Sequence, residues 1–398
     1  MARVLCVWEQ GANLGHLANL RLAMEVALQA GHQVSLVARQ LHEVRGVLGD
    51  LPITVLPAPY KQNVRVGGQE EFLSYTHLLQ RQCFATADEL ATYVAAWRTL
   101  YALLQPDLVV FEHSPTALIA ALDGRFKKVL TGGGFAVPLR GPAGGPFQPF
   151  PTTNLTPAVR QRLLADDAQL LQLINQALRS LGCAPLVALD GIYGQADASL
   201  LTTWPELDHY GARAGAFYIG ALPPPRQALP VWPAGAGPKV LGYLSVMPGL
   251  EALLQALQAA GVCALLLVRD LPAALRQRYT SAHMAFVDHA VDLHAAATQV
   301  AWVLNNGNHG SVAHFALAGV PQLMIPLHQE HLFVALRMLQ HGAGAMAYQD
   351  QPAYGTAVAA MQNPALRDNA QALARTMAPQ AALDAPAQWA QTLAQLLG

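Results

Sequence analysis

The sequence has little charge of either sign. Charged residues make up 12% of its 398 residues, whereas hydrophobic residues make up 53%. Disordered chains have the opposite balance, so the composition excludes a largely disordered protein and indicates an extensive core. The 24 Lys and Arg nearly cancel the 25 Asp and Glu, which leaves a net charge of −1. Because a nucleic-acid-binding protein needs a basic surface to neutralise phosphates, we do not expect nucleic acid as a partner.

Cysteine is also scarce. The four cysteines are far apart, and none has the CxxC or Cys/His spacing that is typical of a metal site. Such cysteines are typical of free thiols in a reducing compartment. The sequence also lacks an uninterrupted apolar run of about 18 residues and a signal-peptide pattern. We therefore expect a cytoplasmic protein with no transmembrane segment and no bound metal.

Short apolar runs alternate with helical patterns along the chain. An apolar run at Arg3–Trp8 precedes a helical pattern at Gly15–Ala30 and a second apolar run at Gln33–Ala38. This alternation predicts parallel strands covered by helices on both faces. A chain of 398 residues is long enough for two such domains. The expected fold class is α/β, with two Rossmann-like, doubly wound parallel sheets.

A proline-rich stretch separates the two halves. Prolines recur through residues 223–238, where they prevent a regular helix or strand. The Ala- and Gln-rich end of the chain has too little charge for a solvated helix, so we expect it to pack back on the first domain. The predicted organisation is an N-terminal domain at 1–222, a linker at 223–238, a C-terminal domain at 239–378 and a final helix at 379–398.

The loop after the first strand has features of a ligand site. Ligands of open parallel sheets bind at the carboxyl ends of the strands, and this loop contains Gly11 and Gly15 and ends at His16. The glycine spacing is not GxGxxG, which disfavours a dinucleotide site. His16 begins a helix, and the positive helix end favours the neutral imidazole that a general base requires. The alternative is a histidine that only caps the helix.

A carboxylate follows a second strand, which we expect at Asp107–Phe111. Glu112 comes directly after this strand. From there it is able to accept a ring N–H of His16, which fixes the tautomer of the imidazole. The residues therefore suggest a His16–Glu112 dyad. Two alternatives stay open: Glu112 pairs with an arginine, or His113 is the working side chain.

The most specific segment lies in the second half. After an apolar run at Val300–Leu304, residues 306–311 read Asn-Gly-Asn-His-Gly-Ser, and we expect a helix to begin near Ser311. Unpaired N–H groups at a helix start, together with a serine hydroxyl, form a site for a diphosphate. A capped helix without a ligand is the alternative, although a cap would not need so many polar side chains.

As a set, these motifs resemble the inverting GT-B glycosyltransferases of the macrolide and UDP-glucuronosyl type. That family has HGGxGT, then Gly-Val-Pro, then P-x-x-x-D-Q-x-x-N-A. Here residues 306–311 match the first motif, residues 319–321 read Gly-Val-Pro, and residues 326–335 read Pro-Leu-His-Gln-Glu-His-Leu-Phe-Val-Ala. Gly15-His16 and Tyr218-Ile-Gly220 also resemble the family's residues. The resemblance spans nearly the whole chain, with the motifs in the family's order.

The resemblance implies two facing domains, one for the acceptor and one for a nucleoside-diphosphate sugar such as a UDP or dTDP sugar. It implies that His16 deprotonates an acceptor hydroxyl and that Glu112 supports it, with inversion at the anomeric carbon and no metal or other cofactor. The expected activity is hexosyl transfer to a small, fairly apolar acceptor by a monomer or homodimer. Expected donor-binding residues are Ser245, Asn306, Gly307, Asn308, His309, Gly310, Ser311, Glu330 and His331. Expected acceptor-binding residues are Glu9, Asn13, His113, Phe135 and Phe147.

Four positions depart from the family pattern. Glu112 stands where the family commonly has an aspartate, Asn306 replaces a phosphate-facing histidine, His331 replaces a glutamine, and Val334 replaces an asparagine. The family's sugar preference therefore does not carry over. Two alternatives to transfer stay open: a weak or inactive scaffold that binds a nucleotide sugar, and a GT-B nucleotide-sugar epimerase or hydrolase.

Overall fold

The chain forms two compact units. The computed structural model describes residues 1–11, 15–61, 72–82, 84–139, 144–222, 226–349 and 353–398. Unit 1 contains Met1–Thr202, Ala214–Ile219 and Asp384–Gly398, and unit 2 contains Thr203–Arg213 and Gly220–Leu383. The division differs from a single boundary at residue 222, because residues 203–213 pack with unit 2 although they precede that boundary.

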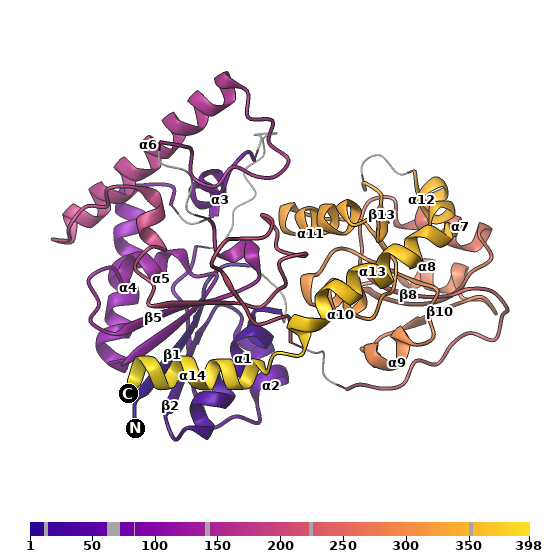
Figure 1. Ribbon diagram of the computed structural model, residues 1–398, viewed down its shortest axis with the longest axis horizontal. Coiled ribbons are helices and arrows are strands. Elements are labelled where there is room, and N and C mark those ends of the chain that lie inside the picture. The colour runs from indigo at the N-terminus through magenta and orange to yellow at the C-terminus, as the bar shows by residue number, and fades with distance from the viewer. Residues whose placement is uncertain (12–14, 62–71, 83, 140–143, 223–225, 350–352) are drawn as a thin grey trace. The chain divides into compact units, whose positions relative to one another are not determined.

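Unit 1 is built on a seven-stranded sheet in the order β3-β2-β1-β4-β5-β6-β7 (Figure 1). All of its strand pairings are parallel. The order reverses beside β1, which pairs with β2 on one side and with β4 on the other, and ligands of such sheets bind at this switch point. The strands are β1 (Arg3–Trp8), β2 (Gln33–Ala38), β3 (Thr54–Pro57), β4 (Leu108–Glu112), β5 (Lys127–Gly132), β6 (Ala198–Leu201) and β7 (Phe217–Tyr218).

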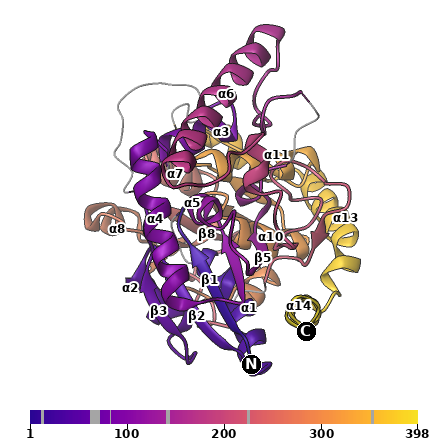
Figure 2. The same cartoon turned by 90° about the vertical axis from the view of Figure 1, so that its left-hand side faces the viewer.

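The helices of unit 1 form two groups by their contacts, and in Figure 2 α4 lies to the left of β1 and α14 to its right. In the first group, α1 (Gly15–Gln29) contacts α2 (Leu41–Leu48) and α14 (Ala385–Leu397). In the second, α4 (Ala87–Leu104) contacts α5 (Pro115–Ala120) and α6 (Pro157–Ser180), and α6 also contacts α3 (Tyr75–Gln82). Short 3-10 turns lie at Gly134–Ala136 and Leu189–Ile192.

Side-chain caps divide two helical stretches of the chain. The helices α3 and α4 are separate, because the Thr86 side chain accepts a hydrogen bond from the Glu89 N–H and so caps a new helix start. The final helix begins at Ala385 and not at residue 379, which lies inside α13 (Pro364–Ala381). Asp384 caps α14 by accepting from the Ala387 N–H. Helical periodicity continues across both breaks, so it did not reveal them.

Unit 2 contains a six-stranded sheet in the order β10-β9-β8-β11-β12-β13. Both faces are buried: Val240 and Leu244 of β8 belong to one hydrophobic cluster, and Leu241 between them belongs to another. This is why the strands read as continuous apolar runs. The strands are β8 (Lys239–Ser245), β9 (Cys263–Arg269), β10 (Met284–Val287), β11 (Trp302–Asn305), β12 (Gln322–Met324) and β13 (Gly344–Met346).

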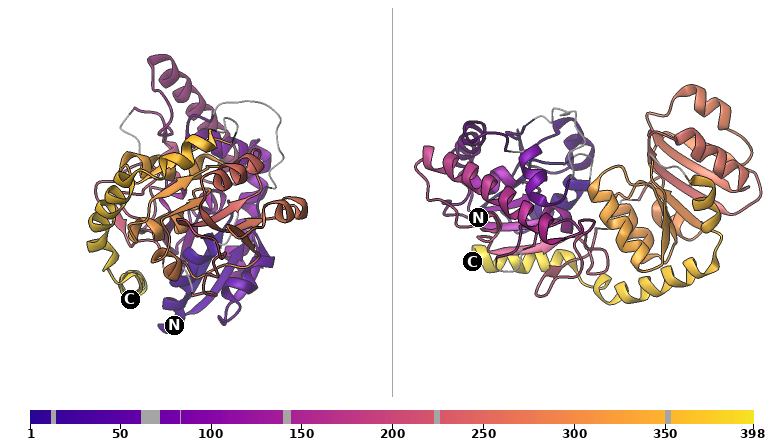
Figure 3. Two further views of the ribbon diagram at one scale, coloured as in Figure 1. Left: turned by 90° about the vertical axis from the view of Figure 1, so that its right-hand side faces the viewer. Right: turned by 90° about the horizontal axis from the view of Figure 1, so that it is seen from above.

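Helices flank this second sheet, and α13 runs along the outside of the unit (Figure 3). The other helices are α7 (Leu250–Ala259), α8 (Ala273–Tyr279), α9 (Leu293–Ala297), α10 (His309–Leu317), α11 (Gln329–Gln340) and α12 (Tyr354–Ala360). The α/β fold class with two doubly wound parallel sheets is thus confirmed.

The described part of the proline-rich stretch, residues 226–238, has no helix or strand and is bound to unit 2. Trp232 donates its indole N–H to Gln299, and the Cys263 thiol donates to the Pro233 carbonyl. Cys6, Cys183 and Cys263 are free thiols, and Cys83 lies outside the described residues. Within the described ranges, no helix has the length and apolarity needed to cross a bilayer.

Candidate active site

The switch point of unit 1 brings His16 and Glu112 together. Trp8 at the end of β1 is in register with Glu112 at the end of β4, and α1 begins immediately before His16. His16 Nδ1 lies 2.6 Å from Glu112 Oε2. The other carboxylate oxygen accepts a hydrogen bond of 3.2 Å from the Asn19 side chain. Of the two partners considered for Glu112, the carboxylate therefore contacts the histidine.

The state of Glu112 determines which nitrogen of His16 is basic. Burial of this carboxyl, which is 1% exposed, opposes ionisation, but the interactions with His16 outweigh it and the pKa of Glu112 is lowered. An ionised carboxylate has no proton to donate, so His16 Nδ1 carries the hydrogen and donates it. In the neutral ring, the lone pair is then on Nε2. This is the tautomer that accepts a proton from a hydroxyl group.

The His16–Glu112 dyad fits only because the two neighbouring residues, Gly11 and Gly132, have no side chain. A Cβ on Gly11, which has φ +86°, would lie 2.1 Å from His16 Nε2. A Cβ on Gly132, which has φ +113°, would lie 2.7 Å from Glu112 Oε1. Both the positive φ and the close approach require glycine. The sequence pointed to Gly11 through its loop, but nothing in the sequence linked Gly132 to Glu112.

Rings surround His16. Trp8 stacks on it with ring centroids 5.2 Å apart, and the His113 ring is 6.0 Å away on the side of Phe135. His113 is buried, and burial together with the nearby His16 lowers its pKa to about 4. His113 is therefore neutral at pH 7 and presents a polar but uncharged ring beside the dyad.

Phe135 and Phe147 belong to a buried aromatic cluster. The Tyr75 ring lies 6.3 Å from Phe135 and 6.0 Å from Phe147, and Tyr193 and Phe150 complete the cluster. Since Phe135 also contacts His113, this apolar wall begins next to the dyad. The sequence places Phe150 in the same stretch as Phe135 and Phe147, but it gave no sign of Tyr75 and Tyr193, because they come from separate segments that only the fold brings together.

Carboxylates of α6 hold this wall in place. Asp167 accepts hydrogen bonds of 2.5 Å from the Thr76 hydroxyl and 2.6 Å from the Phe147 N–H. It thus connects α3, which carries Tyr75, to the loop that carries Phe147. The adjacent Asp166 lies 3.0 Å from His77 Nε2. These carboxylates had no sequence signal, since they are part of an ordinary charged helix face.

Glu9 faces a helix, which corrects the expectation that it contacts an acceptor. Its carboxylate accepts hydrogen bonds from the N–H groups of Thr116 and Ala117 at the start of α5, at 2.9 and 3.1 Å. Burial raises the pKa of Glu9 to about 7 despite these bonds. The residue stabilises α5 behind the dyad. Asn13, the other expected acceptor residue in this loop, lies outside the described residues.

In unit 2, the Asn306 side chain forms hydrogen bonds with the ends of β8 and β12, and it does not extend from the loop towards a nucleotide-sugar donor. Its Oδ1 accepts from the Ser245 N–H at 2.8 Å, and its Nδ2 donates to the Ile325 carbonyl at 2.9 Å. With both ends of the amide engaged and the residue 1% exposed, Asn306 replaces the expected phosphate contact by a structural one. Gly307 follows with φ +94°, and a Cβ there would lie 2.8 Å from the His331 carbonyl.

The α10 helix begins at His309, two residues earlier than expected. Its N-cap Asn308 makes no side-chain cap hydrogen bond, and its Oδ1 instead lies 3.2 Å from His331 Nε2. Gly310 is exposed, with open space where a Cβ would be, and Ser311 follows in the first turn. A helix start without a side-chain cap directs its N–H groups outward, which is the arrangement that binds phosphate.

Histidines surround this helix start. His309 Nε2 lies 2.7 Å from the Thr203 hydroxyl, and its ring stacks on His209. His331 is buried in α11 beside His328, the N-cap of that helix, and Glu330 lies in the same first turn. Thr203, His209 and His328 were missed, because the first two lie more than ten residues before the expected domain boundary at residue 222 and the third has no counterpart in the motif.

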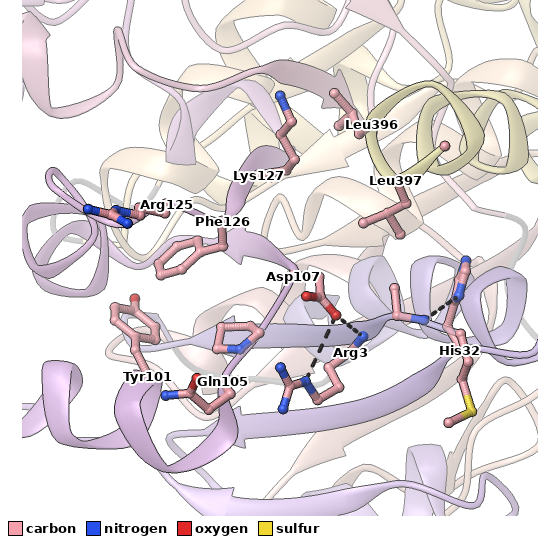
Figure 4. Close-up of a pocket in the computed structure, with 14 residues that line it drawn as sticks. Arg3, His32, Tyr101, Gln105, Asp107, Arg125, Phe126, Lys127, Leu396 and Leu397 are labelled. Carbon is pink, nitrogen blue, oxygen red and sulfur yellow. Dashed lines mark hydrogen bonds and ion pairs between the residues drawn. The ribbon is translucent and has the colours of Figure 1, made fainter.

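A hollow of about 730 Å³ lies at the opposite, amino-terminal edge of the unit 1 sheet (Figure 4). Arg3, Asp107, Lys127 and Leu397 are among the residues that line it. Asp107 accepts from the Arg3 N–H there, at 2.7 Å. Since parallel sheets bind ligands at their carboxyl edge, this hollow is separate from the dyad. Among the described residues, no group of three or more His, Cys, Asp or Glu has an arrangement that could hold a metal ion.

Comparisons with known proteins find similarity in structure alone. No protein-family model and no curated protein sequence matches the chain. The glycotransferase of kitacinnamycin is similar at TM-score 0.73 and 16% identity, over 100% of this chain and 99% of that one. The glycosyltransferase VinC in complex with dTDP is similar at TM-score 0.62 and 18% identity, over 99% of this chain and 98% of that one. The rhamnosyltransferase SpnG complexed with spinosyn aglycone is similar at TM-score 0.65 and 17% identity, over 99% of this chain and 100% of that one. The chain therefore has the GT-B fold.

Proposed function

We propose that the chain is an inverting glycosyltransferase that moves a sugar from a nucleoside-diphosphate sugar to a hydroxyl of a small, fairly apolar acceptor. The observation that carries the proposal is the His16–Glu112 pair at the carboxyl edge of the unit 1 sheet, with His16 held in the tautomer that accepts a proton at Nε2. GT-B neighbours that are glycosyltransferases, one with dTDP and one with an aglycone, support it.

In this reaction the acceptor hydroxyl gives its proton to His16 Nε2 while its oxygen attacks the anomeric carbon. The bond from that carbon to the diphosphate oxygen breaks, and its electron pair leaves with the diphosphate. Glu112 stabilises the imidazolium that forms. The open N–H groups at the start of α10 receive the developing charge on the leaving group, so we propose metal-independent transfer.

The aromatic wall and His113 support the proposed acceptor class. Phe135 and Phe147 belong to an apolar cluster that begins next to the base, and the neutral His113 adds a polar group there. This is the pattern of small-molecule sites, in which a mostly apolar lining carries a few polar groups. We also propose a cytoplasmic location, because free cysteines are typical of reducing compartments.

The test is to measure consumption of UDP-glucose and dTDP-glucose with and without a panel of hydroxylated polyketide aglycones. We expect consumption that depends on the acceptor and a product of inverted anomeric configuration. Equal consumption without acceptor would instead identify a hydrolase or epimerase. Nucleotide binding without any turnover would leave the scaffold hypothesis, which the diverted Asn306 side chain favours.

A further inference from the structure

Four histidines gather around the starts of α10 and α11 in unit 2. We call His209, His309, His328 and His331 the histidine cluster. The His209 and His309 rings are nearly parallel, with centroids 5.2 Å apart. The His328 and His331 rings are 3.6 Å apart. The cluster therefore joins the loop at residues 203–213 to the N-terminal ends of two helices.

The charges around the cluster are few. Burial, and then the positive neighbours that include Arg213, lower the pKa of His209 well below its usual value. Burial likewise lowers the pKa of His331, and it lowers that of His309 to about 4. Arg213 is itself paired with Asp208 at 2.6 Å, with both side chains buried. Glu330 is the acidic residue in the first turn of α11. Without a ligand, His209, His309 and His331 are neutral at pH 7.

Two independent observations point to an anion here. The N-terminus of α10, a helix of nine residues, has no side-chain cap. His331, which is 6% exposed, has a buried Nδ1 with no hydrogen-bond partner among the described residues. A buried ring nitrogen without a partner is costly, and protonation beside an anion removes that cost. The described histidines have no metal-binding arrangement, so a cation shared among them is not the explanation that their geometry favours.

We propose that the histidine cluster takes up protons from solvent when the diphosphate of the donor binds at the start of α10, and that the resulting imidazolium balances the charge of the leaving diphosphate. The cluster would thus perform the task that Asn306 cannot, since that side chain is held by Ser245 and Ile325. This inference rests on the proposed function and adds to it the source of the balancing charge.

The direction of the pH effect follows from the pKa values. In the free protein His209, His309 and His331 are neutral near pH 7, and a diphosphate within about 4 to 6 Å raises the pKa of a histidine by roughly 1 to 3 units. Protons are therefore taken up on binding at pH values between the free and the bound pKa. The donor binds more tightly as pH falls from 8 to 6, and this advantage is lost as pH rises through the bound-state pKa.

The experiment is titration calorimetry of the full chain with UDP-glucose and dTDP-glucose. In these probes the terminal phosphate is esterified, so the ligand itself does not titrate between pH 6 and 8. Binding is measured at pH 6.5 in buffers of different ionisation enthalpy. A rise of two to three units takes the pKa of His309 from about 4 to between about 6 and 7, so we expect uptake of about 0.2 to 0.8 proton per ligand. The affinity should be roughly 2- to 10-fold weaker at pH 8 than at pH 6.

Variants assign the protons. His309→Asn keeps a polar partner for Thr203 but cannot be protonated, so it should lose most of the uptake. His289→Asn makes the same change at an exposed position of unit 2 and should retain the uptake. His328→Asn provides a second test, because Asn is a good N-cap for α11 and preserves the fold.

Three results would overturn the inference. Binding without proton uptake would mean that the cluster acts as neutral hydrogen-bond donors, with the proposed function intact. Unchanged uptake in both His309→Asn and His328→Asn would assign the protons elsewhere. Failure of UDP-glucose, dTDP-glucose and the free diphosphates to bind at all would overturn both this inference and the proposed function.

Discussion

His16 in unit 1 and His309 in unit 2 each lie at the first turn of a helix that follows a strand, but their neighbours differ. His16 contacts the ionised Glu112 at 2.6 Å, which assigns the ring hydrogen to Nδ1 and the lone pair to Nε2. His309 contacts a neutral hydroxyl and another histidine. A carboxylate prepares one imidazole to accept a proton from a bound hydroxyl. In the proposed mechanism His309, which stacks on His209, is protonated only when the diphosphate of the donor binds.

The largest expected effect comes from His16→Ala. Loss of a general base lowers kcat by about 100- to 10,000-fold. Binding of dTDP should not change, because the donor residues are in the other unit. Steady-state kinetics and calorimetry on the same preparation separate the two effects. Transfer at the wild-type rate would show that His16 is not the general base, and its proposed difference from His309 would then be wrong.

Gly11→Ala tests whether Nε2 must be approachable. A Cβ at this position would lie 2.1 Å from His16 Nε2, so we expect the ring to be displaced and kcat to fall by at least about 10-fold. The positive φ of Gly11 adds about 1 kcal/mol of strain to the folded state. Gly15→Ala is the matched control, because nothing lies within 4 Å of its Cβ and activity should persist. Equal losses in both variants would point to general damage at the start of α1.

Asn306→Ala tests the structural basis of the donor side. It removes the acceptor of the part-buried Ser245 N–H and the donor to the buried Ile325 carbonyl. We expect a loss of about 2 to 4 kcal/mol in the free energy of unfolding, measured with urea. Donor affinity should fall as well, since Ser245 and the start of α10 are held by this amide. A variant that keeps wild-type stability but loses nucleotide binding would show that Asn306 contacts the ligand directly.

The smallest expected effect is the contribution of His113 in unit 1 to the pH dependence of the free energy of unfolding. Its pKa of about 4 lies below the ordinary value of 6.5, so the unfolded chain binds more protons and stability falls as pH drops from 6.5 towards 4. Between pH 7 and pH 5 this one residue should account for about 2 kcal/mol of lost stability. His113→Gln should reduce the pH dependence of urea unfolding by that amount. An unchanged dependence would mean that His113 titrates normally.

The sequence revealed the elements that are adjacent in the chain or fixed by topology. The strands β1 and β4 were recognisable as apolar runs, and the switch point between them explains why His16 and Glu112 meet. The start of α10 was visible as a polar, glycine-containing segment after β11. In each of these cases the residues lie within a turn of a strand end, where the topology of a parallel sheet fixes their position.

Long-range side-chain contacts could not be predicted. Glu9 and Asn306 occupy positions typical of ligand residues, but their side chains form hydrogen bonds with backbone groups of distant segments. Glu9 bonds to the start of α5, and Asn306 bonds to the ends of β8 and β12. His209 belongs to unit 2 although it precedes the linker, because residues 203–213 pack there. These outcomes depend on where loops settle, which neither periodicity nor motif spacing describes.

The pairing of β1 with β4 also sets the chemistry. Trp8 is aligned with Glu112, and a slip of one residue would shift the carboxylate by about 3.3 Å and turn it to the opposite face of the sheet. No misaligned sheet can therefore hold Glu112 against His16. Recovery of the dyad during refolding would report that these two central strands have found their native alignment, which makes catalytic competence a sensitive marker for correct assembly of unit 1.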